Sequence, residues 1–83
     1  MDEVQLRHLK THVVDARGGA CPGPLLETKK ALTGVPVGDI LETLSSDEGT
    51  KADIPVWARK TGQEYLGTVA DSGYDHIYVR RLK

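Results

Sequence analysis

Cys21 is the residue of this sequence that is best suited to covalent chemistry. It is followed by Pro22-Gly23-Pro24 and preceded by Gly-Gly-Ala, at a predicted junction between a strand and a helix. Unpaired N–H groups at a helix N-terminus stabilise an anion, so a thiolate there has a lowered pKa and is the reactive form. The two prolines fix φ and preorganise the turn. This context supports an exposed, reactive thiol as strongly as the alternative, a small buried apolar residue, which is the usual role of a free cysteine.

The rest of the sequence limits what such a thiol can do. Cys21 is the only cysteine, which excludes an intrachain disulfide and a two-cysteine redox cycle. Together with His8, His12 and His76 it matches no zinc-binding spacing, so no metal is expected. No Cys-His-Asn pattern indicates a cysteine protease. A single nucleophilic sulfur can still accept a group and pass it on, which is the chemistry of a carrier.

The apolar pattern predicts the elements that position Cys21. Strands are expected where β-branched residues alternate, and helices where apolar residues recur every three or four positions. The predicted strands are 9–16, 39–45, 63–71 and 74–82, and the predicted helices are 22–33 and 51–61. The order βαβαββ predicts an α/β two-layer sandwich, with two helices on one face of a four-stranded mixed sheet.

Several residues mark the expected ends of these elements and the core. Gly34 and Gly62 are expected to end the two helices, and Pro55 indicates that the second helix either starts late or has an irregular first turn. The residues 71–73, Asp-Ser-Gly, are typical of a hairpin turn. Trp57 is expected in the core rather than at a cofactor. The residues expected to be buried beneath the helices are Leu25, Leu32, Ile40, Ile54, Trp57 and Val79.

Length, charge and composition restrict the class of protein. The chain has 83 residues and a formal net charge of −1, so we expect one domain, residues 1–83, with residues 1–7 frayed. No apolar run is long enough to cross a membrane, and the N-terminus has no signal-peptide character. These features predict a cytoplasmic protein. The charge balance gives no reason to expect nucleic acid as a partner.

The residues around Cys21 resemble a known family. Val14-Asp15-Ala16-Arg17-Gly18, followed by Cys21-Pro-Gly-Pro, is similar to the LDxxGxxCPxP signature of the TusA/SirA-like sulfur carrier proteins. Further matches are Asp47-x-Gly49 and Asp53-Ile-Pro-x-Trp. The resemblance covers about residues 12–83, and the CPxP motif in this setting is specific. The family's fold, a βαβαββ sandwich, agrees with the fold predicted from the apolar pattern.

The resemblance implies a function for Cys21. In the family, this cysteine accepts sulfane sulfur as a persulfide from a cysteine desulfurase or a rhodanese-type donor. It then passes the sulfur to a reactive cysteine of an acceptor protein. The resemblance therefore implies a sulfurtransferase-type relay rather than an independent enzyme, with no cofactor beyond the covalently carried sulfur. Because a carrier docks only transiently with its partners, we expect the isolated protein to be a monomer.

Three further residues are candidates for docking or for the environment of the thiol. Arg17 belongs to the motif, Lys29 stands where the family often has Arg, and Asp47 ends a strand at the edge where Cys21 is expected. Asp47 has an alternative role as a helix cap.

The end pathway stays open. The motif has Gly23 where tRNA-thiolation members carry an acidic residue, so sulfur oxidation, molybdenum-cofactor synthesis and tRNA thiolation all remain candidates. A rival hypothesis is a non-catalytic interaction or nucleic-acid-binding module with a structural Cys21, because fold alone does not define function.

Overall fold

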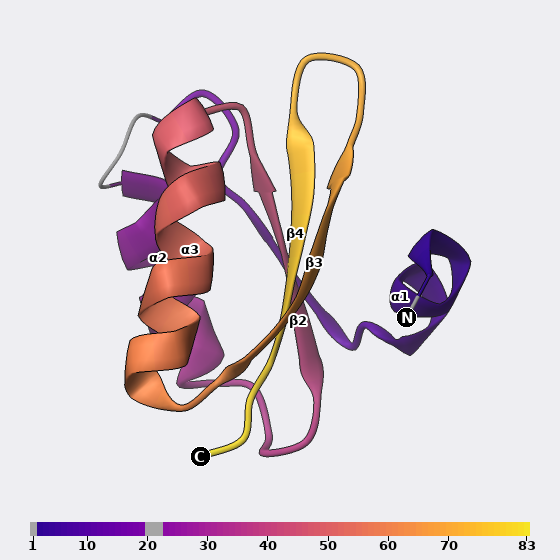
Figure 1. The fold of residues 1–83 in the computed structure, drawn as a ribbon, viewed down its shortest axis with the longest axis vertical. Helices are drawn as coiled ribbons and strands as arrows, with labels where there is room; N and C mark the ends of the chain where they lie inside the picture. Colours follow the sequence, from indigo (N-terminus) through magenta and orange to yellow (C-terminus); the bar gives the residue numbers. More distant parts are fainter. Residues whose placement is uncertain (1, 20–22) are drawn as a thin grey trace.

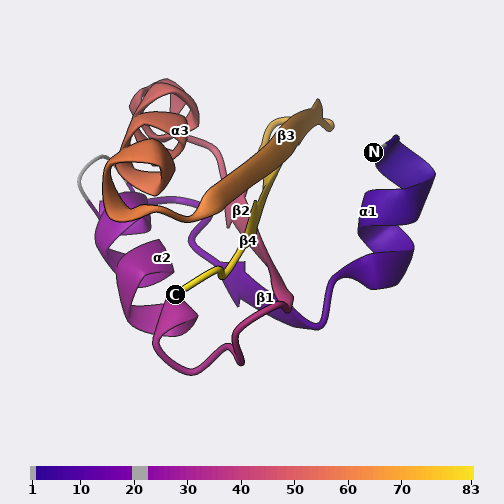
Figure 2. The ribbon, with the colours of Figure 1, turned by 60° about the horizontal axis from the view of Figure 1, so that its bottom comes forward.

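The computed structural model describes residues 2–19 and 23–83, and within them three helices and four strands. In chain order these are α1 (Glu3–Leu9), β1 (His12–Asp15), α2 (Gly23–Leu32), β2 (Ile40–Ser45), α3 (Glu48–Thr61), β3 (Glu64–Ala70) and β4 (Asp75–Arg80). From β1 onward the order is βαβαββ, so the predicted fold class is confirmed. Helices α2 and α3 cover one face of the sheet, and α1 lies on the other (Figures 1 and 2).

The sheet is mixed, with the strand order β1-β2-β4-β3. β1 is parallel to β2, and β4 is antiparallel to both of its neighbours. Asp15 is level with Leu44, and Asp75 pairs with Ser45 on one side and Ala70 on the other. The loop after β1, the loop after β2 and the β3–β4 turn therefore lie at one end of the sheet.

The core between the sheet and the two helices is aliphatic. Its buried members are Leu32, Val35, Leu41, Ile54, Ala58, Ile77 and Val79, with the half-buried Leu25 and Trp57 packed against them. This agrees with the prediction for all expected core residues except one. Ile40 faces the opposite side, where it packs against Leu6 and Tyr78. Side chains alternate along a strand, and Leu41 already faces the helices, so Ile40 must face away from them.

Residues 3–9 form helix α1, where the sequence predicted a frayed segment over residues 1–7; Met1 lies outside the described residues. Asp2 and Gln5 form a capping box, in which each side chain accepts a hydrogen bond from the other residue's backbone N–H. Leu6 is 2% exposed and packs against Ile40 and Tyr78. The capping box satisfies the helix start, and one buried leucine holds the helix on the sheet. The first strand accordingly begins at His12, later than predicted.

Helix α3 begins earlier than predicted, at Glu48, and continues through Pro55. A proline within a helix removes one backbone hydrogen bond. Two local features offset this cost: Asp47 caps the helix, and Ile54 is fully buried beside the proline. Gly62 ends the helix in the left-handed conformation, with φ 79°, as predicted.

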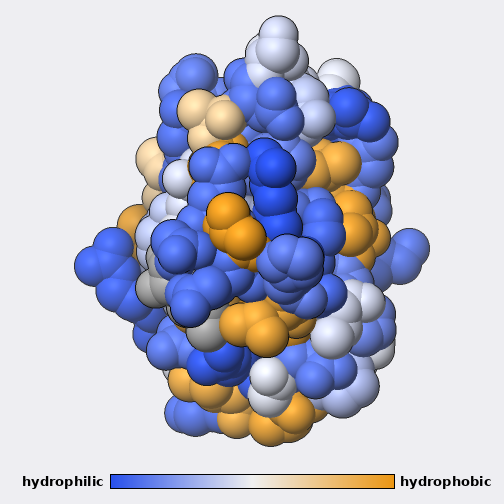
Figure 3. Space-filling view, turned by 90° about the vertical axis from the view of Figure 1, so that its right-hand side faces the viewer, coloured by the Kyte–Doolittle hydropathy of each residue, from blue (hydrophilic) through white to orange (hydrophobic). Residues whose placement is uncertain are grey.

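The side of the molecule that carries α1 is mostly hydrophilic, with separate apolar patches (Figure 3). Leu6 is the buried residue of α1, whereas Val4 is 62% exposed. The attachment of this helix therefore depends on one apolar side chain.

We predict that Leu6→Ala lowers the free energy of unfolding by about 2–4 kcal/mol, because it removes a fully buried leucine. Val4→Ala, made in the same helix, should change it by less than about 0.5 kcal/mol. Urea unfolding of both variants measures the difference. Equal effects would show that α1 does not dock through Leu6.

Candidate functional site

The candidate site lies at the end of the sheet where β1 and β2 both finish. Three segments meet there: the loop 17–19, the loop 46–47 and the turn 71–74. Helix α2 begins beside them at Gly23. The predicted nucleophile Cys21 and the predicted positioning residue Pro22 lie outside the described residues, so the site is described through its surroundings.

Arg17 is fixed at the start of the loop by Asp15. Its Nε and Nη2 atoms donate hydrogen bonds of 2.9 and 2.8 Å to the two carboxylate oxygens of Asp15. The backbone N–H of Arg17 donates to the same carboxylate at 3.1 Å. Hydrogen bonds from the Arg17 side chain and backbone lower the pKa of Asp15 to about 2. The pair is thus ionised at neutral pH, with Arg17 exposed and held in one orientation.

The next two residues bring the loop against its neighbours. Gly18 has a φ of 85°, which favours glycine, and its N–H donates to Ser46 Oγ at 2.9 Å. A Cβ on Gly19 would lie 3.4 Å from the carbonyl oxygen of Ala16 and 3.6 Å from Cδ of Pro24. The loop therefore lies against the first turn of α2, at van der Waals distance from Pro24.

Beneath the site lies a layer of buried hydroxyl groups that sequence reasoning did not identify. Its members are Thr28, Thr43, Ser45 and Thr50. Thr28 Oγ1 donates to the carbonyl of Pro24 at 2.8 Å and is 2.9 Å from Thr43 Oγ1. One sequence signal could have indicated this layer. Thr43 and Ser45 are polar, although they share with Leu41 the face of β2 that packs against the helices. The layer ties the first turn of α2 to β2.

Asp47 is the N-cap of α3. Its Oδ2 atom accepts hydrogen bonds from the N–H of Thr50 at 2.9 Å and from the Thr50 hydroxyl at 3.0 Å. Its own N–H donates to Ser45 Oγ at 3.1 Å. From the sequence, Asp47 could serve either as a docking residue or as a helix cap, and the structure shows the cap. Asp47 also lies at the same end of the sheet as the loop 17–19.

The β3–β4 turn adds an aromatic side chain that was not predicted for the site. The guanidinium carbon of Arg17 lies 4.8 Å from the centroid of the Tyr74 ring, within the range of a cation–π contact. Sequence spacing gives no signal for this contact, because the two residues are brought together only by the pairing of β1, β2 and β4.

Lys29 lies apart from the other predicted docking residues. It is exposed on the second half of α2, about 9 Å along the helix axis from Gly23. There it lines a shallow groove of about 330 Å³ together with Trp57 and residues near the C-terminal ends of both helices. The structure brings Arg17 and Asp47 to the same end of the sheet but does not bring Lys29 there.

Within residues 2–19 and 23–83, no group of three His, Asp or Glu side chains is arranged to hold a metal ion. None of the helices described is long and apolar enough to cross a membrane.

The βαβαββ sheet with two helices on one face defines the chain as a small α/β sandwich protein. The glycine loop 18–19 at one end of the sheet directly precedes the Cys-Pro-Gly-Pro motif in the sequence. The family model "Sulfurtransferase TusA" matches residues 12–81. The chain belongs to this family. Helix α1 lies outside the matched region.

Known proteins with similar sequences and structures agree. A putative sulfur carrier protein of Archaeoglobus fulgidus is 49% identical over 71 residues, which cover 86% of this chain and 97% of that protein. The sulfur carrier protein TusA of Allochromatium vinosum is 31% identical over 68 residues, covering 82% and 90% of the two chains. The crystal structure of a SirA-like protein from Desulfitobacterium hafniense superposes with a TM-score of 0.70 at 25% identity, covering 88% of this chain and all of that one.

The capping role of Asp47 can be separated from a docking role by two substitutions. Asp47→Ala should lower the free energy of unfolding by about 1 kcal/mol, because it removes the N-cap acceptor. Asp47→Ser keeps an acceptor oxygen and should stay within a few tenths of a kcal/mol of the wild type. Thermal or urea unfolding measures both values. If Asp47→Ser is as destabilised as Asp47→Ala, capping is not the main contribution of this side chain.

Proposed function

We propose that this protein is a sulfur carrier that holds a transferable persulfide on Cys21. The observation that carries the proposal is the Cys-Pro-Gly-Pro motif in a chain of the TusA family, with the motif leading into the N-terminus of α2. The relatives named sulfur carriers support it. The partial positive charge of a helix N-terminus favours an anionic sulfur close to it.

The transfer requires two displacement steps on sulfur. The Cys21 thiolate attacks the outer sulfur of the donor's persulfide, the donor's S–S bond breaks, and the donor thiolate leaves. An acceptor thiolate then attacks the outer sulfur of the Cys21 persulfide, and the Cys21 thiolate is released. One sulfane sulfur moves in each step and no external oxidant or reductant is needed, so the chain requires no cofactor for this chemistry.

The chain's own residues would hold the thiol for both steps. A Cβ added at Gly19 would be in van der Waals contact with the Pro24 ring, so the loop 17–19 lies beside the first turn of α2. The bond from Thr28 to the Pro24 carbonyl fixes the first turn of α2 from below. A rigid presentation of this kind lowers the entropy lost when a partner docks.

The partners that this chemistry requires are a persulfide donor and an acceptor with a reactive cysteine. A cysteine desulfurase or a rhodanese-type protein would supply the sulfur. Arg17 is exposed beside the motif, and we propose that it contacts a partner or the thiol's surroundings; Asp47 would act at the same end of the sheet. Lys29 would contribute only where a partner also reaches along α2.

Sulfur acceptance provides the direct test of the function. Wild-type protein incubated with a persulfide donor should gain the mass of one sulfur atom, and this mass should be lost on reduction. Cys21→Ser should gain none and should melt at nearly the same temperature as the wild type. Equal sulfur uptake by both proteins, or unfolding of Cys21→Ser, would contradict the proposal.

The reactivity of the thiol gives a second test. We expect the pKa of Cys21 to lie below the ordinary value of about 8.5, because the N-terminal N–H groups of a helix stabilise the thiolate. The rate of alkylation by iodoacetamide, measured against pH, reports this pKa. A midpoint above about 8.5 would indicate a thiol buried among apolar groups instead.

A further inference from the structure

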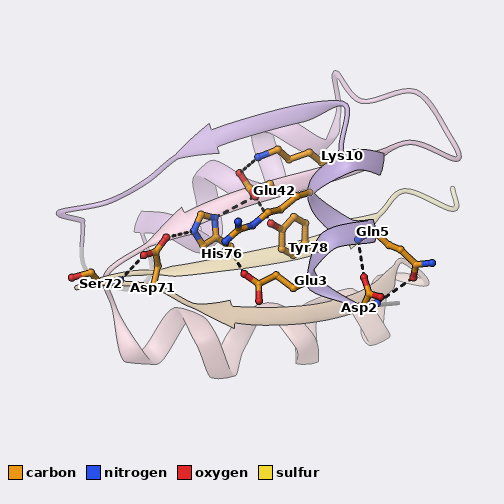
Figure 4. A network of polar contacts seen from close by, with 10 residues as sticks. Asp2, Glu3, Gln5, Lys10, Glu42, Asp71, Ser72, His76 and Tyr78 are labelled. Atoms are coloured by element: carbon orange, nitrogen blue, oxygen red, sulfur yellow. Dashed lines mark hydrogen bonds and ion pairs between the residues drawn. The ribbon is translucent and has the colours of Figure 1, made fainter.

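A buried carboxylate lies on the sheet face that α1 covers. Glu42, in the central strand β2, is 2% exposed. Lys10 Nζ donates to its Oε1 at 2.8 Å, and the Tyr78 hydroxyl donates to its Oε2 (Figure 4). Burial raises the pKa of Glu42, but the hydrogen bonds from Lys10 and Tyr78 outweigh this effect and hold the pKa below its ordinary value. Glu42 is therefore a fixed, ionised anchor at neutral pH.

His76 connects this anchor to the β3–β4 turn. Its Nδ1 lies 3.3 Å from Glu42 Oε2, and its Nε2 lies 2.7 Å from Asp71 Oδ2 (Figure 4). Carboxylates only accept hydrogen bonds, and a neutral imidazole has a single N–H donor. Only the doubly protonated ring can donate to both carboxylates at once. Loss of one proton must release one of the two contacts.

Asp71 also stabilises the β3–β4 turn. Its carboxylate accepts the N–H of Ser72 at 2.7 Å, and its own N–H donates to the Tyr74 carbonyl at 2.8 Å. Hydrogen bonds from His76, Ser72 and the Tyr74 side chain lower the pKa of Asp71 to about 2. The rings of Tyr74 and His76 also lie 5.1 Å apart. The position of Tyr74 is therefore coupled to that of His76.

Tyr74 completes the connection to the candidate site. Its ring lies under the guanidinium group of Arg17 at 4.8 Å. Arg17 begins the segment that leads through Gly18 and Gly19 to the motif. A continuous set of contacts thus extends from the buried Glu42, through His76, Asp71 and Tyr74, to the loop of the candidate site.

We propose that His76 is a positioning residue for this loop: its protonated ring holds the β3–β4 turn, and through Tyr74 the turn holds Arg17 in place. This role adds a positioning residue to the proposed sulfur-carrier function, and the sulfur-transfer measurement below depends on that function. Because only the doubly protonated ring can bond to both carboxylates, loop positioning depends on the protonation of His76 and hence on pH. It is firmest at acidic pH and weakens as the ring loses a proton.

Several charged or titratable groups surround His76 and influence how its contacts change with pH. Glu42 comes from β2, Asp71 and Tyr74 from the turn, and Tyr78 from β4, where its ring stacks on His76 at 6.5 Å. From the α1 side come Lys10, bound to Glu42, and Arg7, which acts on Tyr78. Both carboxylates have a lowered pKa, and Tyr78 has a raised one.

The test uses two measurements on the full chain, one of them independent of sulfur. In wild-type protein, the NMR signal of Arg17 Nε–H should shift with pH at the same midpoint as the His76 ring signals. His76→Gln should abolish this shift. In a donor-to-acceptor assay at mildly acidic pH, His76→Gln should lower kcat/KM by about threefold, and the difference from wild type should shrink as pH rises.

Two further variants complete the test. His12→Gln is a matched control, since His12 is a histidine on β1 whose ring bonds to Thr11, and it should keep both wild-type properties. Tyr74→Leu leaves His76 and Glu42 intact but removes the ring beneath Arg17, and it should reproduce the His76→Gln effects even if that variant folds poorly.

The proposal is overturned if the Arg17 signal does not follow the titration of His76, or if Tyr74→Leu behaves as the wild type. Failure of Cys21 to accept sulfur would instead contradict the proposed function, while the NMR result would still decide the role of His76.

Discussion

The structure depends on the burial of both faces of β2. Leu41 and Thr43 face the helices α2 and α3, while Ile40 and Glu42 face α1. The parallel pairing with β1 and the antiparallel pairing with β4 then fix three connecting segments at one end of the sheet. A register shift of one residue would exchange the two faces of β2, placing Glu42 under the helices without its partners. The pairing register of β2 therefore determines which loops come together at the candidate site.

The face covered by α1 combines an apolar cluster of Leu6, Ile40 and Tyr78 with polar contacts to a buried carboxylate. Burial of a carboxylate costs several kcal/mol unless it is paired and hydrogen-bonded. Lys10 and Tyr78 supply these bonds to Glu42. Since the pKa of Glu42 is lowered in the fold, its contribution to stability is present above the ordinary carboxylate pKa and is lost as pH falls below it. The same ionised group can therefore serve as the fixed end of the contacts that lead to Arg17.

A carrier must present its reactive group to two different partners in succession, which favours a rigid end of the molecule. The hydroxyl layer around Thr28 and Thr43, the N-cap at Asp47 and the Arg17–Asp15 pair all act at this end. Each uses hydrogen bonds with defined directions, whereas the aliphatic core beneath is non-directional. Orientation at the site is thus set by polar contacts, and cohesion by apolar burial.

The sequence by itself determined the βαβαββ order, because alternation, helical spacing and glycine stops are local signals. It also determined the family, because the motif around Cys21 is contiguous. The tertiary structure alone decided the docking of α1 through Leu6, the side of the sheet on which Ile40 lies, and the continuation of α3 through Pro55. It alone brought Tyr74 beneath Arg17 and His76 between two carboxylates. These contacts join residues far apart in the chain, and their formation depends on strand pairing and on which faces are buried, which no local pattern specifies.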